Sequence, residues 1–123
     1  MMRESSRIDV VCGPEVLETV LALTHRWGVE HGVDEVDQAR LSTLVRAAVE
    51  HGGRFRPRGL SLLISRHEPG QVRIDLRWHG SSGSALVEGD VREIIATLDA
   101  FADRWGFSGS GTDPVHWMVV RAG

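Results

Sequence analysis

The six histidines have the widest chemical repertoire of any side chains here, because imidazole can bind a metal ion or exchange a proton near neutral pH. They are scattered along the chain. No pair has the H-x-x-x-H or E-x-x-H spacing that places two metal ligands on one helix face. No metal site is therefore expected. The histidines are His25, His31, His51, His67, His79 and His116.

The side chains that could act as nucleophiles give no stronger signal. Cys12 is the single cysteine, which excludes an intramolecular disulfide and a cysteine-rich metal site. With no evident His/Asp partner, it is interpreted as a small buried apolar residue. The run Ser81-Ser82-Gly83-Ser84 has the composition of a phosphate-binding loop. No lysine or helix start follows it, so it is interpreted as an ordinary loop.

The stretch from Asp34 to Gly53 has the clearest helical pattern. Apolar residues recur at i, i+3, i+4 and i+7, which predicts one buried stripe on an amphipathic helix. Asp34 is expected to cap the N-terminus, with Asp37 at the capping-box position, and Gly52-Gly53 is expected to end the helix. Arg46 falls outside the stripe, which consists of Leu41, Leu44, Val45 and Ala48.

The other elements follow from alternation, helical spacing and turn residues. Residues 71–78 alternate strictly, so Val72, Ile74, Leu76 and Trp78 are expected on one buried face. Together with residues 60–65 they predict an antiparallel hairpin across the turn around Pro69-Gly70. Further strands are expected at 7–11, 105–107 and 115–120, and further helices at 15–27, ended by Gly28 and Gly32, and from Asp90 to about 103.

The element order is therefore β-α-α-β-β-α-β-β. It predicts an α+β fold, a two-layer α/β sandwich with a mixed, mostly antiparallel sheet and helices on one face. A length of 123 residues fits one domain, 1–123. The formal net charge of −3 gives no case for binding nucleic acid or an anionic membrane surface. No run approaches the roughly 18 apolar residues of a membrane span, so a cytoplasmic location is expected.

Two segments resemble the anti-sigma factor serine kinases of the GHKL (histidine kinase-like) ATPase superfamily. The helical segment STLVRAAVEHG is similar to the family pattern S-E-L-V-x-N-A-x-x-H, with agreement at Ser42, Leu44, Val45, Ala48 and His51. Near the end, LDAFADRWG resembles L-V-D-A-L-A-D-R-W-G, followed by a glycine-containing turn and a last strand with tryptophan. The resemblance covers most of the chain and implies the same sandwich fold.

The positions that carry the family's ATP chemistry differ in this chain. Thr43 stands at the position of the family's glutamate, and Ala47 at that of the asparagine that binds Mg²⁺. A methyl group cannot coordinate Mg²⁺, and a threonine hydroxyl is not a general base at neutral pH. Trp78 replaces the aspartate of the D-x-G-x-G motif that contacts adenine, of which Gly80 alone remains. The phosphate-binding glycines before the last helix have no counterpart around residues 92–94, or only Gly89 in a shifted register.

The resemblance therefore implies a pseudokinase with a degenerate nucleotide pocket formed by Thr43, Ala47, His51, Trp78 and Gly80. For His51 the favoured interpretation is an imidazole near the helix C-terminal dipole, and pocket lining is the alternative. Neither catalysis nor a cofactor is expected. The implied role is a regulatory module that binds a sigma factor or a STAS-type anti-sigma antagonist, with a homodimer as a further possibility. The alternatives are an active serine kinase that uses ATP and Mg²⁺, or a small-ligand binder that uses the vacated pocket.

Overall fold

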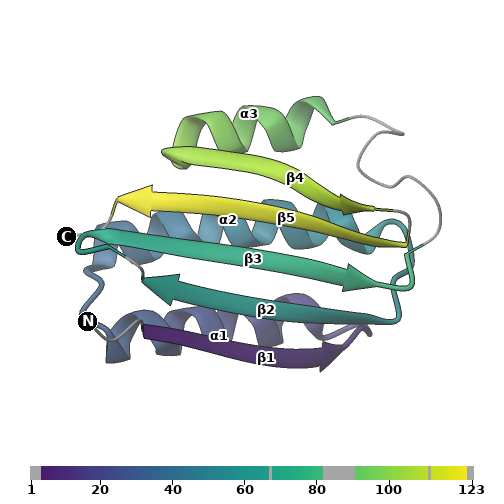
Figure 1. The fold of residues 1–123 in the computed structure, drawn as a ribbon, viewed down its shortest axis with the longest axis horizontal. Helices are drawn as coiled ribbons and strands as arrows, with labels where there is room; N and C mark the ends of the chain where they lie inside the picture. Colours follow the sequence, from purple (N-terminus) through teal and green to yellow (C-terminus); the bar gives the residue numbers. More distant parts are fainter. Residues whose placement is uncertain (1–3, 67, 82–90, 111, 122–123) are drawn as a thin grey trace.

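The computed structural model describes residues 4–66, 68–81, 91–110 and 112–121. Along the chain the elements follow the expected order of strands and helices (Figure 1). They are β1 (Glu4–Val11), α1 (Val16–Glu30), α2 (Glu35–Gly53), β2 (Gly59–Arg66), β3 (Gln71–His79), α3 (Arg92–Phe101), β4 (Arg104–Ser110) and β5 (Asp113–Arg121).

The five strands form one sheet in the order β1-β2-β3-β5-β4, and every described strand pair is antiparallel. In Figure 1 the strands lie in front, α1 and α2 lie behind them, and α3 lies beyond β4. No helix of the described residues therefore covers the outer face of the sheet. This arrangement confirms the predicted two-layer α+β sandwich, with a sheet that contains no parallel pair in its described part.

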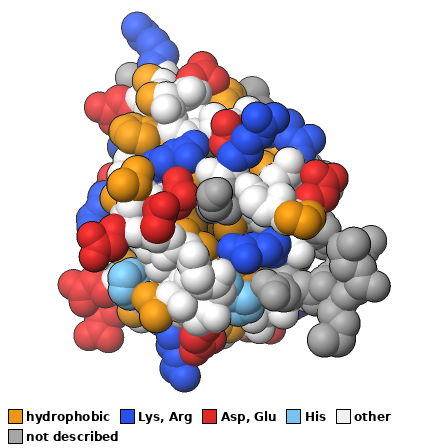
Figure 2. Space-filling view, turned by 90° about the vertical axis from the view of Figure 1, so that its left-hand side faces the viewer, with side chains coloured by type: hydrophobic (Ala, Val, Ile, Leu, Met, Phe, Trp, Pro, Cys, Tyr) orange, Lys and Arg blue, Asp and Glu red, His pale blue; other side chains and the backbone are white. Residues whose placement is uncertain are grey.

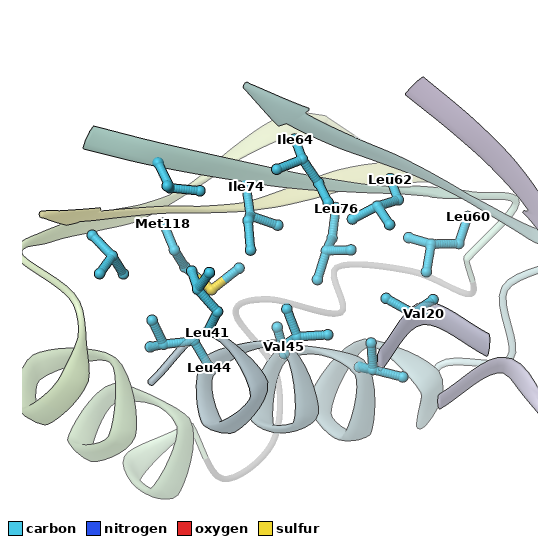
Figure 3. Close-up of a cluster of buried hydrophobic side chains, with 14 of the residues drawn as sticks. Val20, Leu41, Leu44, Val45, Leu60, Leu62, Ile64, Ile74, Leu76 and Met118 are labelled. Carbon is cyan, nitrogen blue, oxygen red and sulfur yellow. The ribbon is translucent and has the colours of Figure 1, made fainter. Parts of the chain in front are cut away.

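The expected helix cap and buried stripe of α2 are both present. Asp34 precedes the helix, and its carboxylate accepts a hydrogen bond from the backbone N–H of Asp37 at 2.8 Å. Leu44 and Val45 are fully buried, whereas Arg46 is exposed. Figure 3 shows the stripe facing the sheet, where it meets the inward side chains of Leu60, Leu62, Ile64, Ile74, Leu76 and Met118.

Helix α1 is longer than predicted, because Gly28 does not end it. The helix continues to Glu30, and Gly32, with a φ of 73°, follows the last turn instead. A side chain at position 28 would collide with the amide of Gln38 on α2. Gly28 is therefore a point of close helix approach, which sequence spacing alone cannot distinguish from a helix stop.

The strands also extend beyond their predicted ends. Strand β4 runs through Ser108 and Gly109, which the sequence placed in a turn, because these residues pair with Val115 and Pro114 of β5. Asp90, the expected cap of the third helix, and the Ser82–Gly83–Ser84 part of the loop lie outside the described residues. The described helix begins at Arg92 after Val91, which makes no side-chain cap.

Candidate functional site

A hollow of about 370 Å³ lies between α2 and α3. From α2 it is lined by Ala47, Glu50 and His51, with Arg54 directly after the helix. The first turns of α3 complete the lining with Glu93, Ile94, Ala96 and Thr97. Two residues of the pocket expected from the sequence, Ala47 and His51, line this space, which we call the α2–α3 hollow. It is the candidate functional site.

Behind His51 a chain of hydrogen bonds leads into the core. The indole Nε1–H of Trp78 donates to Nδ1 of His116 at 2.9 Å. The other ring nitrogen of His116, Nε2, lies 3.0 Å from Nδ1 of His51. Trp78 and His116 have no exposed surface, and His51 is 4% exposed. Side chains from β3, β5 and α2 are thus joined in one buried polar chain.

The direction of these bonds fixes the tautomers of both histidines. An indole nitrogen can only donate, so Nδ1 of His116 must be the acceptor. Neutral His116 then carries its proton on Nε2 and donates it to Nδ1 of His51. His51 must in turn carry its own proton on Nε2, which has no hydrogen-bond partner among the described residues. The chain therefore holds His51 as a neutral donor at the wall of the α2–α3 hollow.

Burial keeps both imidazoles neutral. Loss of solvation lowers the pKa of His116 to about 3, with a smaller contribution from His51. Burial also lowers the pKa of His51, and the nearby guanidinium of Arg54 lowers it further. His51 does lie in the last turn of α2, as predicted. This position agrees with the favoured interpretation, an imidazole near the helix C-terminal dipole, and the ring also lines the α2–α3 hollow, as the alternative proposes.

Trp78 packs directly against the end of α2. A side chain at Gly52 would overlap the indole ring of Trp78. The ring therefore fits only because residue 52 has no side chain. The predicted inward orientation of Trp78 is confirmed by its complete burial, and the indole explains the glycine at position 52.

The structure brings together only part of the set that the sequence proposed. Ala47 and His51 line the hollow, and Trp78 reaches it through His116. Thr43 is not part of the lining, because its hydroxyl donates to the carbonyl of Ala39 at 3.0 Å within the helix.

Gly80 is separate again, in the turn after β3. It has a φ of 71°, and its N–H donates to Asp113 at 3.2 Å. A side chain at this position would meet the guanidinium of Arg58. Gly80 therefore belongs to the turn after β3, where its N–H contacts Asp113 of β5, and it does not line the α2–α3 hollow.

His116 is the member of the site that sequence reasoning missed. The strand pattern VHWMVV held the signal, because alternation places His116 on the same face as Met118 and Val120. Both of these are core residues. An imidazole within an apolar stripe needs a buried hydrogen-bond partner. The pattern therefore predicts a second polar side chain in the core next to His116.

Comparisons with known proteins identify the fold. No protein-family model and no curated protein matches the chain. Among solved structures it is similar to the crystal structure of the RsbU and RsbW domains of Rv1364c from Mycobacterium tuberculosis, with a TM-score of 0.78 and 15% identity. The alignment covers 97% of this chain and 32% of that chain. At this level of identity the likeness shows a shared fold.

The chain thus spans about a third of the length of the solved chain that it resembles. Within the part of the chain that the structure describes, no helix combines the length and the apolar character needed to cross a membrane.

Proposed function

We propose that the chain is a regulatory protein-interaction module, similar to anti-sigma factors, without ATPase or kinase activity. The observation that carries this proposal is the buried chain from Trp78 through His116 to His51. The family resemblance assigns an adenine-binding aspartate to position 78. An indole whose one polar atom is already bonded inside the protein cannot accept a hydrogen bond from a nucleotide.

The residues around the α2–α3 hollow do not fit Mg-ATP. Ala47 presents a methyl group where Mg²⁺ would require an oxygen ligand. The hydroxyl of Thr43 is bonded to its own helix and cannot serve as a base. Glu93 and Ile94 replace phosphate-binding glycines in the first turn of α3, and Glu93 would repel a triphosphate. These features support loss of nucleotide chemistry.

The partner we propose is a sigma factor or a STAS-type anti-sigma antagonist in the cytoplasm, with a second copy of this chain as a possible homodimer mate. A protein partner suits the charge on one face of the molecule. On the face shown in Figure 2, basic and acidic side chains are interspersed and do not gather into a basic stripe. A nucleic-acid site would instead require clustered positive charge.

Calorimetric titration with Mg-ATP tests the loss of nucleotide binding. We expect no binding tighter than about 1 mM, and no rise in melting temperature with micromolar ATP. A ligand present at 100 times its Kd adds about 2.7 kcal/mol of stability, so specific binding would be plainly visible. Saturable micromolar binding, or transfer of phosphate from ATP to a co-purified partner, would contradict the proposal and favour the active serine kinase.

Co-purification from the native cell tests the partner. A sigma factor or STAS-type protein should be recovered with the tagged chain and should bind again after both proteins are purified separately. Sedimentation of the purified chain alone decides between monomer and homodimer. If neither class of partner binds the purified chain, the anti-sigma part of the proposal fails, even if ATP binding is absent.

The α2–α3 hollow favours one second candidate function, the binding of a small ligand other than a nucleotide. Its volume of about 370 Å³ lies in the range of small-molecule sites. The fixed N–H donor of His51 and the guanidinium of Arg54 could both meet an acceptor group in this space. A metabolite screen by thermal shift, repeated on His51→Phe, would support this function if a stabilising compound loses its effect in the variant.

A further inference from the structure

A second large hollow, of about 390 Å³, lies on the opposite side of the molecule from the α2–α3 hollow. Its lining comes from the outward-facing side chains of the sheet, on the face turned toward the viewer in Figure 1. On β2, for example, Ser61, Leu63 and Ser65 line it, whereas Leu62 and Ile64 between them point into the core. We refer to this space as the outer hollow.

Two serines of the outer hollow, Ser61 and Ser65, differ in the hydrogen-bond partners of their hydroxyl groups. The hydroxyl of Ser61 donates to Asp9 at 2.6 Å and lies 2.7 Å from Nε2 of His79. Ser65 is also buried, with 2% of its surface exposed, but its hydroxyl has no partner among the described residues. An unpaired buried hydroxyl is costly to a fold, so a group that supplies an acceptor there would be favoured.

Three arginines line the outer hollow together with Ser65, and one of them, Arg73, is the residue directly opposite Ser65 in the pairing of β2 with β3. Arg73 forms a two-point ion pair with Asp75, with contacts of 3.0 Å, and its guanidinium lies 4.9 Å from the ring centre of Trp117. Arg73 is therefore held in a defined position. Arg77 makes no hydrogen bond or ion pair with any described residue. Arg7 contacts Asp9 at 3.4 Å, and both of these side chains are well exposed.

The charge of the outer hollow is positive. Arg7, Arg73 and Arg77 line it against one carboxylate, that of Asp75, so the lining groups carry two positive charges in excess. Asp9, outside the lining, compensates part of this excess through an exposed and therefore weak pair. Leu63 and Val115 add an apolar surface between the charged groups. Guanidinium groups, a free hydroxyl donor and apolar surface together match a small organic anion.

We propose that the outer hollow binds a small organic oxyanion, a carboxylic acid or a phosphate ester. Arg77 and Ser65 donate hydrogen bonds to the anionic group of the ligand. Arg73, held in place by Asp75, contributes a fixed positive charge. The carbon skeleton of the ligand packs on Leu63 and Val115. This site is independent of the α2–α3 hollow and of the regulatory function proposed above. Each proposal can therefore fail without the other.

Thermal unfolding with citrate and with inorganic phosphate tests the site, at constant ionic strength maintained with sodium chloride. Citrate probes the carboxylate chemistry and phosphate the phosphate chemistry. The wild-type melting temperature should rise and saturate with at least one of these anions. Arg77→Gln and Ser65→Ala should each weaken the apparent affinity by tenfold or more. Arg46→Gln, an exposed arginine on α2, is the matched control and should respond like the wild type.

Ser65→Ala has a second signature that loss of folding cannot imitate. Without ligand this variant should be as stable as the wild type or slightly more stable, because the hydroxyl that it removes has no partner. The expected result is therefore a stable protein that no longer responds to the anion.

Four outcomes would overturn the proposal. One is a wild-type protein that responds no more to citrate and phosphate than to chloride. Another is an anion response that survives both variants, which places the site elsewhere. The third is a concentration-dependent dimer in sedimentation that Arg77→Gln dissociates, because the face would then be an interface between copies. Tight binding of a glutamate-rich peptide without any response to the small anions would likewise assign the arginines to a protein partner.

Discussion

Single residues decide the chemistry of the α2–α3 hollow. Trp78 occupies the position where the family resemblance calls for an aspartate, and its N–H is bonded to His116. The bond from Trp78 places the proton of neutral His116 on Nε2, and His116 then donates to Nδ1 of His51. Residue 78 therefore sets the tautomer of His51, which lines the hollow. One substitution thus changes both the packing and the polarity of the site.

Trp78→Asp should destabilise the protein strongly. Burial of an aromatic ring of 150–250 Å² contributes about 4–6 kcal/mol before the entropy cost, and the variant would also bury a carboxylate. Trp78→Phe retains most of the apolar contact but leaves Nδ1 of His116 without a donor, so a smaller loss of about 2–3 kcal/mol is expected. Chemical denaturation measures both variants. Unchanged midpoints would show that the indole is not part of the core.

ATP binding provides a separate readout for the same position. Trp78→Asp should not gain Mg-ATP affinity, because Ala47 still cannot coordinate the metal. Measurable ATP binding by this variant would show that the indole alone had blocked a working pocket.

The pH dependence of stability should report the buried histidines. The folded pKa of His116, about 3, lies below its ordinary value of 6.5, so the unfolded chain binds the proton more readily. Stability is therefore fully present above about pH 6.5 and falls as the pH decreases toward 3, by up to about 1.4 kcal/mol per unit for this group. His51 shifts in the same direction and adds to the slope. Urea denaturation between pH 7 and 4.5 measures it.

The matched variant for this prediction is His116→Gln. Its amide retains one acceptor for Trp78 and one donor for His51 but does not titrate in this range. The pH slope should become shallower and should retain the contribution of His51. The window ends at pH 4.5 because carboxylates with lowered pKa values, those of Asp9, Asp103 and Asp113, contribute as the pH falls toward and below their ordinary value of 3.8. An equal slope in both proteins would show that His116 is not the titrating group.

At the scale of elements, α2 connects the core to the site. One of its faces packs on the sheet, and the neighbouring face supplies Ala47 and His51 to the α2–α3 hollow. Near the end of the helix Gly52 lies against the indole of Trp78, and no larger residue fits there. Packing and site geometry are therefore set by the same helix and cannot vary independently.

Leu44→Ala and Val45→Ala should each destabilise the fold, whereas Arg46→Ala should be nearly silent. The first two residues are fully buried and the third is exposed. Deleting a buried leucine side chain typically costs 2–5 kcal/mol, and an exposed substitution usually changes stability by no more than about 0.5 kcal/mol. Denaturation midpoints of the three variants give the comparison. Three equal midpoints would mean that the buried face of α2 is assigned incorrectly.

At the scale of the whole molecule, Arg40 joins three distant segments. From α2 its guanidinium donates to the carbonyls of Phe101, at 3.0 Å, and of Arg121, at 3.1 Å, and it contacts the carboxylates of Asp37 and Asp103. Asp103 in turn accepts from the N–H of Arg121 at 2.7 Å. The start of α2, the end of α3 and the end of β5 are thereby tied together at one end of the sandwich.

Arg40→Ala should loosen this end of the molecule at a cost of about 1–3 kcal/mol, because several charge-assisted hydrogen bonds are lost together. Arg40→Lys keeps the positive charge but lacks the planar guanidinium with its several N–H donors, so an intermediate loss of stability is expected. Hydrogen exchange should show faster opening of α3 and the C-terminal half of β5, with little change in β1 and β2. Exchange that accelerates equally across the sheet would mean that the effect is global and not a local loosening.

The sequence by itself determined the order of the elements, the sheet-facing stripe of α2, its aspartate cap and the inward face of β3. These features depend on periodicity and on neighbours three or four residues away, which a single sequence displays directly. The burial of Trp78 followed from the same alternation, since residues 71–78 place it with Val72, Ile74 and Leu76.

Only the tertiary structure decided which of these residues meet. His51 and His116 are 65 positions apart, and Trp78 reaches His116 only because β3 and β5 are neighbours in the sheet. Gly28 lies inside a helix, at a position where the side chain of Gln38 from the next helix leaves no room for a Cβ atom. The outer hollow likewise gathers Arg7, Ser65 and Arg77 from three strands. Such contacts depend on strand order and helix packing, and the local spacing of residues predicts neither.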